Sequence, residues 1–256
     1  MMNARARQGA SVDKTHSGWR LGIPGGDASV YRLAQLDDYS QFPRHKLPHR
    51  TLSLSLRARA SSDSIPGTWG FGLWNDPFGL SLGFGGNPFR LPALPNAVWF
   101  FHASKENYLS FRDPSTMSPT NSGSAQGVAA NGFFAQTFYS PSLHPLLIPA
   151  GLVLPFSRKR TRQMLGKVIA EDGIGLSLDV TQWHAYSFKW SPNRVVFFVN
   201  EAQEFESPVS PRGPLGVIIW IDNQYAAFTP EGKIAFGVLE GKESWIEVED
   251  LVIRSA

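Results

Sequence analysis

The stretch that decides the fold is TLSLSLRARA, residues 51–60. Apolar side chains occupy every second position from Leu52 to Ala60, and the residues between them are serines and arginines. A period of two places alternate side chains on opposite faces of a β-strand. One face of this strand is therefore expected to pack on a core while the other faces water, as antiparallel sheets allow.

Short segments on both sides of this stretch carry the same signal. Apolar and aromatic residues gather in short runs, and Gly, Pro, Asn and Ser separate the runs as they do in hairpins and turns. The runs that predict further strands are 29–38, 67–76, 79–83, 97–103, 107–112, 132–139, 183–190, 194–200, 215–222, 233–239 and 245–254. Many short strands of this kind predict an all-β, mostly antiparallel domain built from two packed sheets.

One segment departs from the β pattern. Between residues 158 and 171 the apolar positions recur at helical spacing, and Ser157 stands where an N-cap would be. We therefore expect one short helix inserted between strands. Its apolar residues should pack on the sandwich (Met164, Leu165, Val168 and Ile169), and the basic residues of its first turn should lie in solvent (Arg158, Lys159, Arg160 and Arg162).

The composition narrows the functional classes. The 256 residues include no cysteine, which excludes disulfides and thiolate chemistry. The six histidines are scattered without the spacing of metal ligands, so we expect no metal and no other cofactor. A net charge of +3 is too small to predict a nucleic-acid partner. No apolar run reaches the ~18 residues that a membrane-spanning helix needs, so no membrane partner is expected.

The first 17 residues are polar and aperiodic, so we expect a disordered tail at 1–17 and a single β-sandwich domain at 18–256. All-β sandwiches often reach this length as one unit. No apolar stretch follows the charged residues near the start, which predicts a cytoplasmic protein. A secreted protein whose leader had been removed would show the same absence of an apolar stretch.

A family resemblance comes from the last third of the chain. The segment WHAYSFKWSPNRVVFFVNEAQEFESP (183–208) resembles a hairpin of the laminarinase/lichenase group of glycoside hydrolases. The segment IEVEDLVIR (246–254) is similar to the closing strand of that group, and GTWGFGLWND (67–76) is a weaker match to the strand before its catalytic strand. The resemblance implies the concanavalin A-like fold, a two-sheet antiparallel jelly roll with a sugar cleft. The hairpin matches at Trp183, His184, Tyr186, Trp190, Ser191 and Pro192.

The catalytic acids of that group are missing. Its hydrolases carry Glu-x-Asp-x-Glu, or the same motif with one extra residue, and a retaining mechanism needs two carboxyls about 5–5.5 Å apart. No Glu of this chain is followed two positions later by Asp, and the corresponding region reads NAVWFFHASKENYL (96–109). The pairs Glu204/Glu206 and Glu247/Glu249 have strand spacing, but they lie where the group has no catalytic acids. We interpret both pairs as solvated strand faces.

Glycines next to tryptophan mark one candidate binding strand. Gly70 and Gly72 share a strand face with Trp74, which leaves room there for a ligand or for a crossing backbone. In the region that corresponds to the catalytic strand, Trp99 is a further candidate. His102 follows it, and alternation places His102 on the opposite face from Trp99.

The strand 215–222 carries the second group of candidates. Trp220 and Asp222 share one of its faces, Tyr225 lies just beyond, and the resembled family lines its cleft with this strand. An indole ring can stack on the apolar face of a sugar while a carboxylate accepts hydroxyl protons. The candidate ligand-binding residues are therefore Trp74, Trp99, His102, Trp220, Asp222 and Tyr225.

These residues predict a protein that binds a saccharide or glycoconjugate on the concave face of the jelly roll. One alternative is a glycoside hydrolase or lyase with non-standard catalytic residues, for which Asp222, Glu106 and His102 are the candidates. Another is a structural or protein-interaction module that has kept the sandwich and lost the cleft. The face with the tryptophans discriminates between them. An open groove with two carboxylates at catalytic separation favours an enzyme, an open aromatic groove without them favours binding, and a filled groove favours interaction.

Overall fold

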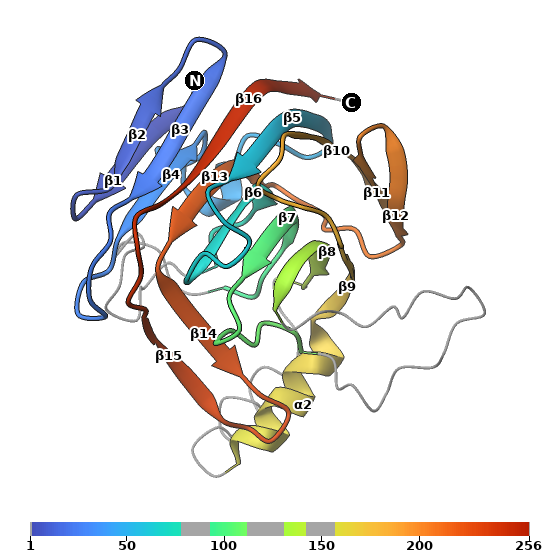
Figure 1. Ribbon diagram of the computed structural model, residues 1–256. Helices are drawn as coiled ribbons and strands as arrows, with labels where there is room; N and C mark the ends of the chain where they lie inside the picture. The colour runs from blue at the N-terminus through green and yellow to red at the C-terminus, as the bar shows by residue number, and fades with distance from the viewer. Residues whose placement is uncertain (1, 78–92, 112–130, 142–156, 256) are drawn as a thin grey trace.

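The computed structural model describes residues 2–77, 93–111, 131–141 and 157–255 and shows a two-sheet antiparallel jelly roll (Figure 1). Sheet A has the strand order β1-β4-β13-β6-β7-β8-β9, and sheet B has the order β12-β11-β10-β5-β16-β3-β2. A small sheet, β14-β15, follows β13. This arrangement confirms the predicted fold class.

The strands are β1 Asn3–Arg7, β2 Ser11–Lys14, β3 Gly18–Ile23, β4 Leu33–Asp37, β5 Leu52–Ala60, β6 Thr68–Trp74, β7 Ala97–Ala103, β8 Gly132–Tyr139, β9 Ala170–Gly175, β10 His184–Ser191, β11 Arg194–Val199, β12 Ala202–Ser207, β13 Gly216–Asp222, β14 Gln224–Phe228, β15 Ile234–Val238 and β16 Ser244–Ser255.

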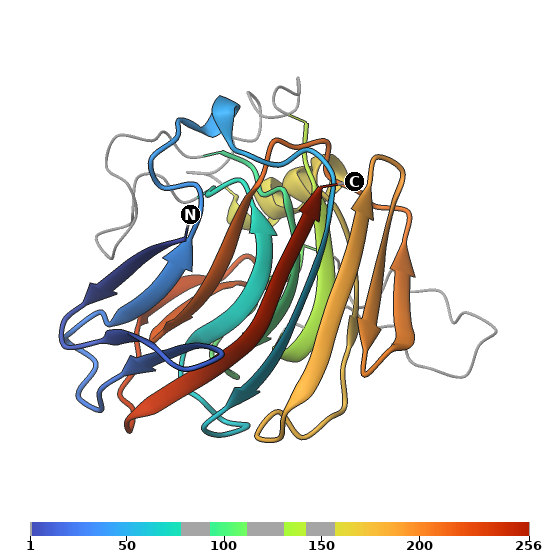
Figure 2. The ribbon, with the colours of Figure 1, turned by 90° about the horizontal axis from the view of Figure 1, so that it is seen from above.

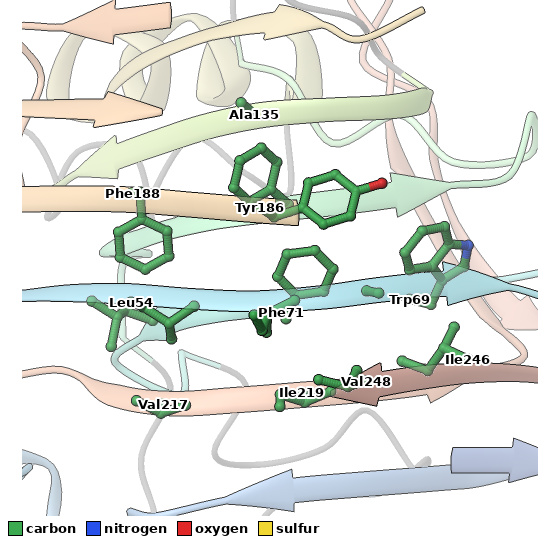
Figure 3. Close-up of a cluster of buried hydrophobic side chains, with 14 of the residues drawn as sticks. Leu54, Trp69, Phe71, Ala135, Tyr186, Phe188, Val217, Ile219, Ile246 and Val248 are labelled. Atoms are coloured by element: carbon green, nitrogen blue, oxygen red, sulfur yellow. The ribbon is translucent and has the colours of Figure 1, made fainter. Parts of the chain in front are cut away.

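The core between the sheets is built from the apolar half of the alternation. Strand β5 pairs with β10 on one side and with β16 on the other, and Leu52, Leu54 and Leu56 are all buried. Sheet A contributes Phe71 and Val217 to the same cluster (Figure 3). The residues between these apolar positions face away from the core, so each sheet has one inner and one outer face.

The predicted helix is present as α2, Arg158–Val168, and the Ser157 side chain accepts a hydrogen bond from the backbone N of Arg160. Leu165 and Ile169 join an apolar cluster on the outer face of sheet A. Figure 2 accordingly places α2 on the far side of the sandwich from β16. The helix ends three residues earlier than expected, because the backbone becomes extended at Ile169 and continues into β9.

The side chain of Arg162 corrects the expectation that the arginines of this helix lie in solvent. It is only 1% exposed, and it donates hydrogen bonds to the backbone oxygens of Phe228 (2.9 Å) and Ser110 (2.8 Å). The other three basic residues of the first turn are exposed, as expected. Arg162 is buried because α2 covers the chain segment after β7 and the strand β14, whose carbonyls need donors.

The expectation of a disordered tail at residues 1–17 is wrong. Strand β1 pairs with β4 at the edge of sheet A, and β2 pairs with β3 at the edge of sheet B. Edge strands pair on one side only and bury little side-chain surface, so a polar composition does not prevent them from forming. The polar composition of this segment therefore reflected two edge positions.

Smaller differences concern single strands. The expected strand at 107–112 is reduced to a bridge between Tyr108 and Ala227, and the segment 79–83 lies outside the described residues. Strands β3, β9 and β14 were not predicted, and β12 was expected only as the strand face that carries Glu204 and Glu206. In the part of the chain that the structure describes, no helix is long and apolar enough to cross a membrane.

Candidate functional site

The outer face of sheet A carries most of the predicted site residues, and the strand register arranges them in rows. One row runs across the sheet through Arg5, Gln35, Trp220, Gly70, Phe101 and Phe134. The row on one side contains Arg7, Leu33, Asp222, Thr68 and Ala103. The row on the other side contains Asn3, Asp37, Ile218, Gly72, Trp99 and Gln136. The face is thus polar over β1 and β4 and aromatic over β7 and β8.

The three predicted tryptophans meet on this face. The rings of Trp74 and Trp220 are nearly parallel, at 5°, with centroids 6.3 Å apart, and Trp99 lies 5.8 Å from Trp220 and 6.4 Å from Trp74. Trp99 and Trp220 are 7% and 6% exposed, while Trp74 is partly exposed. Trp74 is therefore the indole of this group that offers most surface to a ligand.

The glycines make room for these rings. A β-carbon on Gly70 would lie 2.9 Å from Cη2 of Trp220, and one on Gly72 would lie 2.6 Å from Cβ of Trp99. Tyr39 lies in the same way against Gly216 of β13. The nearest atoms of all are backbone oxygens of β7, Phe100 O at Gly70 and Val98 O at Gly72, so the space that the glycines leave is occupied by a neighbouring backbone as well as by Trp220 and Trp99.

Apolar side chains from other segments complete this cluster. Leu109 and Phe111 follow β7, and Leu165 comes from α2; all three pack against the aromatic residues of sheet A, as do Tyr31 and Leu94. The aromatic half of the face is therefore a second hydrophobic core. The half over β1, β4 and β13 carries the exposed polar side chains Arg5 and Arg7.

Asp222 lies at the boundary between the two halves and is held by three donors. Its carboxylate accepts hydrogen bonds from the Thr68 hydroxyl (2.8 Å), the backbone N of Gln224 (3.2 Å) and the Tyr31 hydroxyl (3.4 Å). Trp220 Nε1 donates to the same Thr68 hydroxyl at 3.0 Å. Burial raises the pKa of Asp222 from 3.8 to about 7, and the hydrogen bonds oppose that shift in part.

The acidic side chains on the described strands of this face are far apart. Asp37 on β4 pairs in register with Ile218 on β13. Because Ile218 lies four residues before Asp222, Asp37 and Asp222 are ~13 Å apart along the strand direction. Glu171 lies on β9, four strands from β13, or ~19 Å across the sheet. Glycoside hydrolysis by paired carboxylates needs separations of about 5–9.5 Å. These acids therefore form no pair of that kind.

Three predicted site residues lie away from the tryptophan cluster. His102 faces the sandwich core, where its ring stacks on Trp69 at 5.5 Å and 14° and its Nε2 lies 3.2 Å from the Asp63 carbonyl oxygen. Burial lowers the pKa of His102 to about 4. Glu106 is partly exposed in the turn after β7, and the Tyr225 ring packs over Gly237 in the β14-β15 sheet.

Sequence reasoning missed four polar residues of this face. Arg5 and Arg7 belong to the segment taken for a tail, and Gln35 and Tyr31 lie on or just before β4. The alternation in NARAR, residues 3–7, was a usable signal for the two arginines. Among the described residues, no three His, Cys, Asp or Glu side chains are grouped so that they could hold a metal ion.

Comparisons with known proteins show the fold. No protein-family model matches the chain, and no curated protein matches its sequence. An endo-β-1,4-glucuronan lyase from the fungus Trichoderma reesei superimposes with a TM-score of 0.50 at 8% identity, over 99% of this chain and 90% of that one. A mixed-linkage glucan glycoside hydrolase of family 16 from Bacteroides ovatus gives a TM-score of 0.50 at 9% identity, over 98% and 94%. The chain therefore has a glycoside hydrolase-like jelly-roll fold.

Proposed function

We propose that this protein binds a saccharide without cleaving it, on the outer face of sheet A. The observation that carries the proposal is the partly exposed indole of Trp74, which lies parallel to Trp220 beside the polar half of the face. An exposed indole offers a flat apolar surface to a sugar ring, and the neighbouring polar side chains offer partners to its hydroxyl groups.

The position of the acids argues against hydrolysis. Asp222, Asp37 and Glu171 are separated by more than a retaining or inverting mechanism allows. His102, a candidate for non-standard chemistry, faces the opposite side of sheet A from Asp222. We therefore expect no release of reducing sugar when the protein is incubated with β-1,3 or β-1,4 glucans. Turnover that a single carboxylate substitution abolishes would show that the chain is an enzyme.

A glycan panel followed by calorimetric titration tests the binding. Stacking on one aromatic ring contributes ~0.5–1.5 kcal/mol, so Trp74→Ala should weaken binding by about two- to tenfold. The matched control is Trp183→Ala, which removes an equally partly exposed indole that contacts arginines of sheet B. Binding that is indifferent to Trp74→Ala, or weakened equally by both substitutions, contradicts the proposed site.

A second candidate function is that of a protein-interaction module. The observation in its favour is that the space left by Gly70 and Gly72 is filled by the backbone of β7, the Trp220 ring and the Cβ of Trp99. If no glycan of the panel binds to the folded protein, this second function replaces the first.

A further inference from the structure

The edge strand β1 directs two arginines onto the proposed binding face. Arg5 pairs in register with Gln35, and Arg7 pairs with Leu33, so both lie on the same face as Trp220 and Asp222. Ala4 and Ala6 alternate with them and point the other way. Both arginines are exposed, and the side chain of Arg5 is 41% exposed. The face therefore presents two guanidinium groups to solvent, ~7 Å apart along the strand.

A carboxylate pairs with Arg5, whereas Arg7 has no such partner among the described residues. Arg5 lies 3.7 Å from Asp37, whose oxygens already accept hydrogen bonds from the Gln35 side chain (2.8 Å) and from the backbone N of Ser40 (2.8 Å). Arg7 forms no ion pair with any residue that the structure describes. Asp222, on the same row as Arg7, has a pKa raised by burial to about 7, so it carries less than a full charge near neutral pH.

The arginines on the outer face of sheet B provide a contrast within the same molecule. Arg20 and Arg59 pair with Glu247 at 3.0 and 2.7 Å, and Arg57 pairs with Glu249 at 3.6 Å. Their guanidinium groups also lie over the rings of Trp183 and Trp245. On sheet B each of these cations is matched by a carboxylate and an aromatic ring, whereas the guanidinium of Arg7 on β1 has neither among the residues that the structure describes.

We propose that the saccharide is acidic, and that Arg5 and Arg7 bind its carboxylate groups. This inference rests on the proposed function. A guanidinium binds a carboxylate through two parallel hydrogen bonds, which a neutral hydroxymethyl group cannot accept in the same way. Arg5, Gln35 and Trp220 form one row of the register, and the buried Trp220 lies parallel to the partly exposed Trp74. A sugar chain that runs across the strands from Arg5 to Trp74 therefore meets the arginines, which give selectivity, and then Trp74, which gives a stacking surface.

The test compares two oligosaccharides that differ only in charge: a β-1,4-linked oligoglucose and the oligoglucuronate of the same length and linkage. Calorimetric titration at low ionic strength should show at least tenfold tighter binding of the oligoglucuronate, and added salt should reduce that preference. The double variant R5Q/R7Q should lose the preference, because its affinity for the oligoglucuronate should fall to that for the neutral sugar. The control R254Q removes one exposed arginine from sheet B and should leave the preference intact.

Two outcomes overturn this inference while leaving the proposed function in place. The first is equal binding of the two sugars, and the second is a preference for the acidic sugar that persists in R5Q/R7Q. If neither these two sugars nor any other glycan binds, the proposed function itself fails, and the inference fails with it. Thermal unfolding of each variant shows whether it is folded before any titration is interpreted.

Discussion

The indole ring of Trp220 lies in the space that a side chain at Gly70 would need, since a β-carbon built on Gly70 would stand 2.9 Å from Cη2 of Trp220. The two residues face each other in register on β13 and β6, in the middle of sheet A. The same β-carbon would also clash with the backbone oxygen of Phe100 on the other side. Gly70 therefore decides how deeply the indole sits on the sheet, and with it the shape of the aromatic face.

The first prediction is that Gly70→Ala lowers the free energy of unfolding by about 1–3 kcal/mol, as overpacking of a closely packed site does. The blue-shifted tryptophan emission expected of buried indoles should move to longer wavelength as Trp220 is displaced. The control is Gly22→Ala on β3, where the nearest atom to the new methyl group is 3.4 Å away, an ordinary contact. Urea denaturation measures both variants, and equal stability of the two would contradict the role given to Gly70.

The second prediction concerns Asp222, whose pKa burial raises to about 7 in the folded state. The folded protein then holds a proton between pH 4 and 7 that the unfolded chain has released, so stability should fall as pH rises through this window and level off above it. The loss should be on the order of a few kcal/mol, because each pKa unit corresponds to about 1.4 kcal/mol.

The variant Asp222→Asn isolates this effect, since an amide cannot ionise. Urea denaturation of both proteins from pH 4 to 8 should give a difference in stability that shifts in favour of the variant as pH rises. A constant difference over that range would show that the carboxyl of Asp222 titrates normally.

The third prediction concerns His102, whose pKa is lowered to about 4 by burial. Its effect on the pH dependence of stability is opposite to that of Asp222. Between pH 6.5 and 4 the unfolded chain binds a proton at this residue that the folded protein does not, so stability should fall as pH decreases. An NMR titration of the His102 ring should give a midpoint near pH 4, and His102→Gln should remove this part of the acid sensitivity. A midpoint near 6.5 would mean that the ring is solvated.

The fourth prediction is that Arg162→Met destabilises the fold by about 2–3 kcal/mol, because one buried and one partly buried carbonyl oxygen lose their donor. The control lies two residues earlier: Arg160 is exposed on the same helix, and Arg160→Met should change stability by less than about 0.5 kcal/mol. If the two variants were equally stable, the hydrogen bonds of Arg162 to Phe228 and Ser110 would not stabilise the packing of α2.

The alternation of polar and apolar residues predicted the strands of the core closely. The segments 52–60, 97–103 and 132–139 are strands with these bounds, and the helix after Ser157 begins where its cap indicated. These features are local, because side-chain periodicity and capping depend on neighbours in sequence. The same alternation did not lead to a prediction of the edge strands β1 and β2, because pairing at a sheet edge buries backbone more than side chains.

The candidate site was predictable only in part. The sequence indicated that Trp74, Trp99 and Trp220 would share a face, and the structure brings their rings within 6.4 Å of one another. It could not indicate that the Trp220 ring and the backbone of β7 would occupy the space beside Gly70 and Gly72. Neither could it show that Arg5 would stand in line with Trp220.

By itself, then, the sequence determined the fold class, most strands of the core and the face on which each of their side chains lies. Only the tertiary structure decided which residues become neighbours across that face. The physical reason is that alternation assigns a side chain to a face but not to a partner. The row from Arg5 through Trp220 to Phe101 joins strands from distant parts of the chain, and the packing of whole sheets sets their register. The same packing fills the aromatic half with α2 and leaves the arginines of β1 exposed.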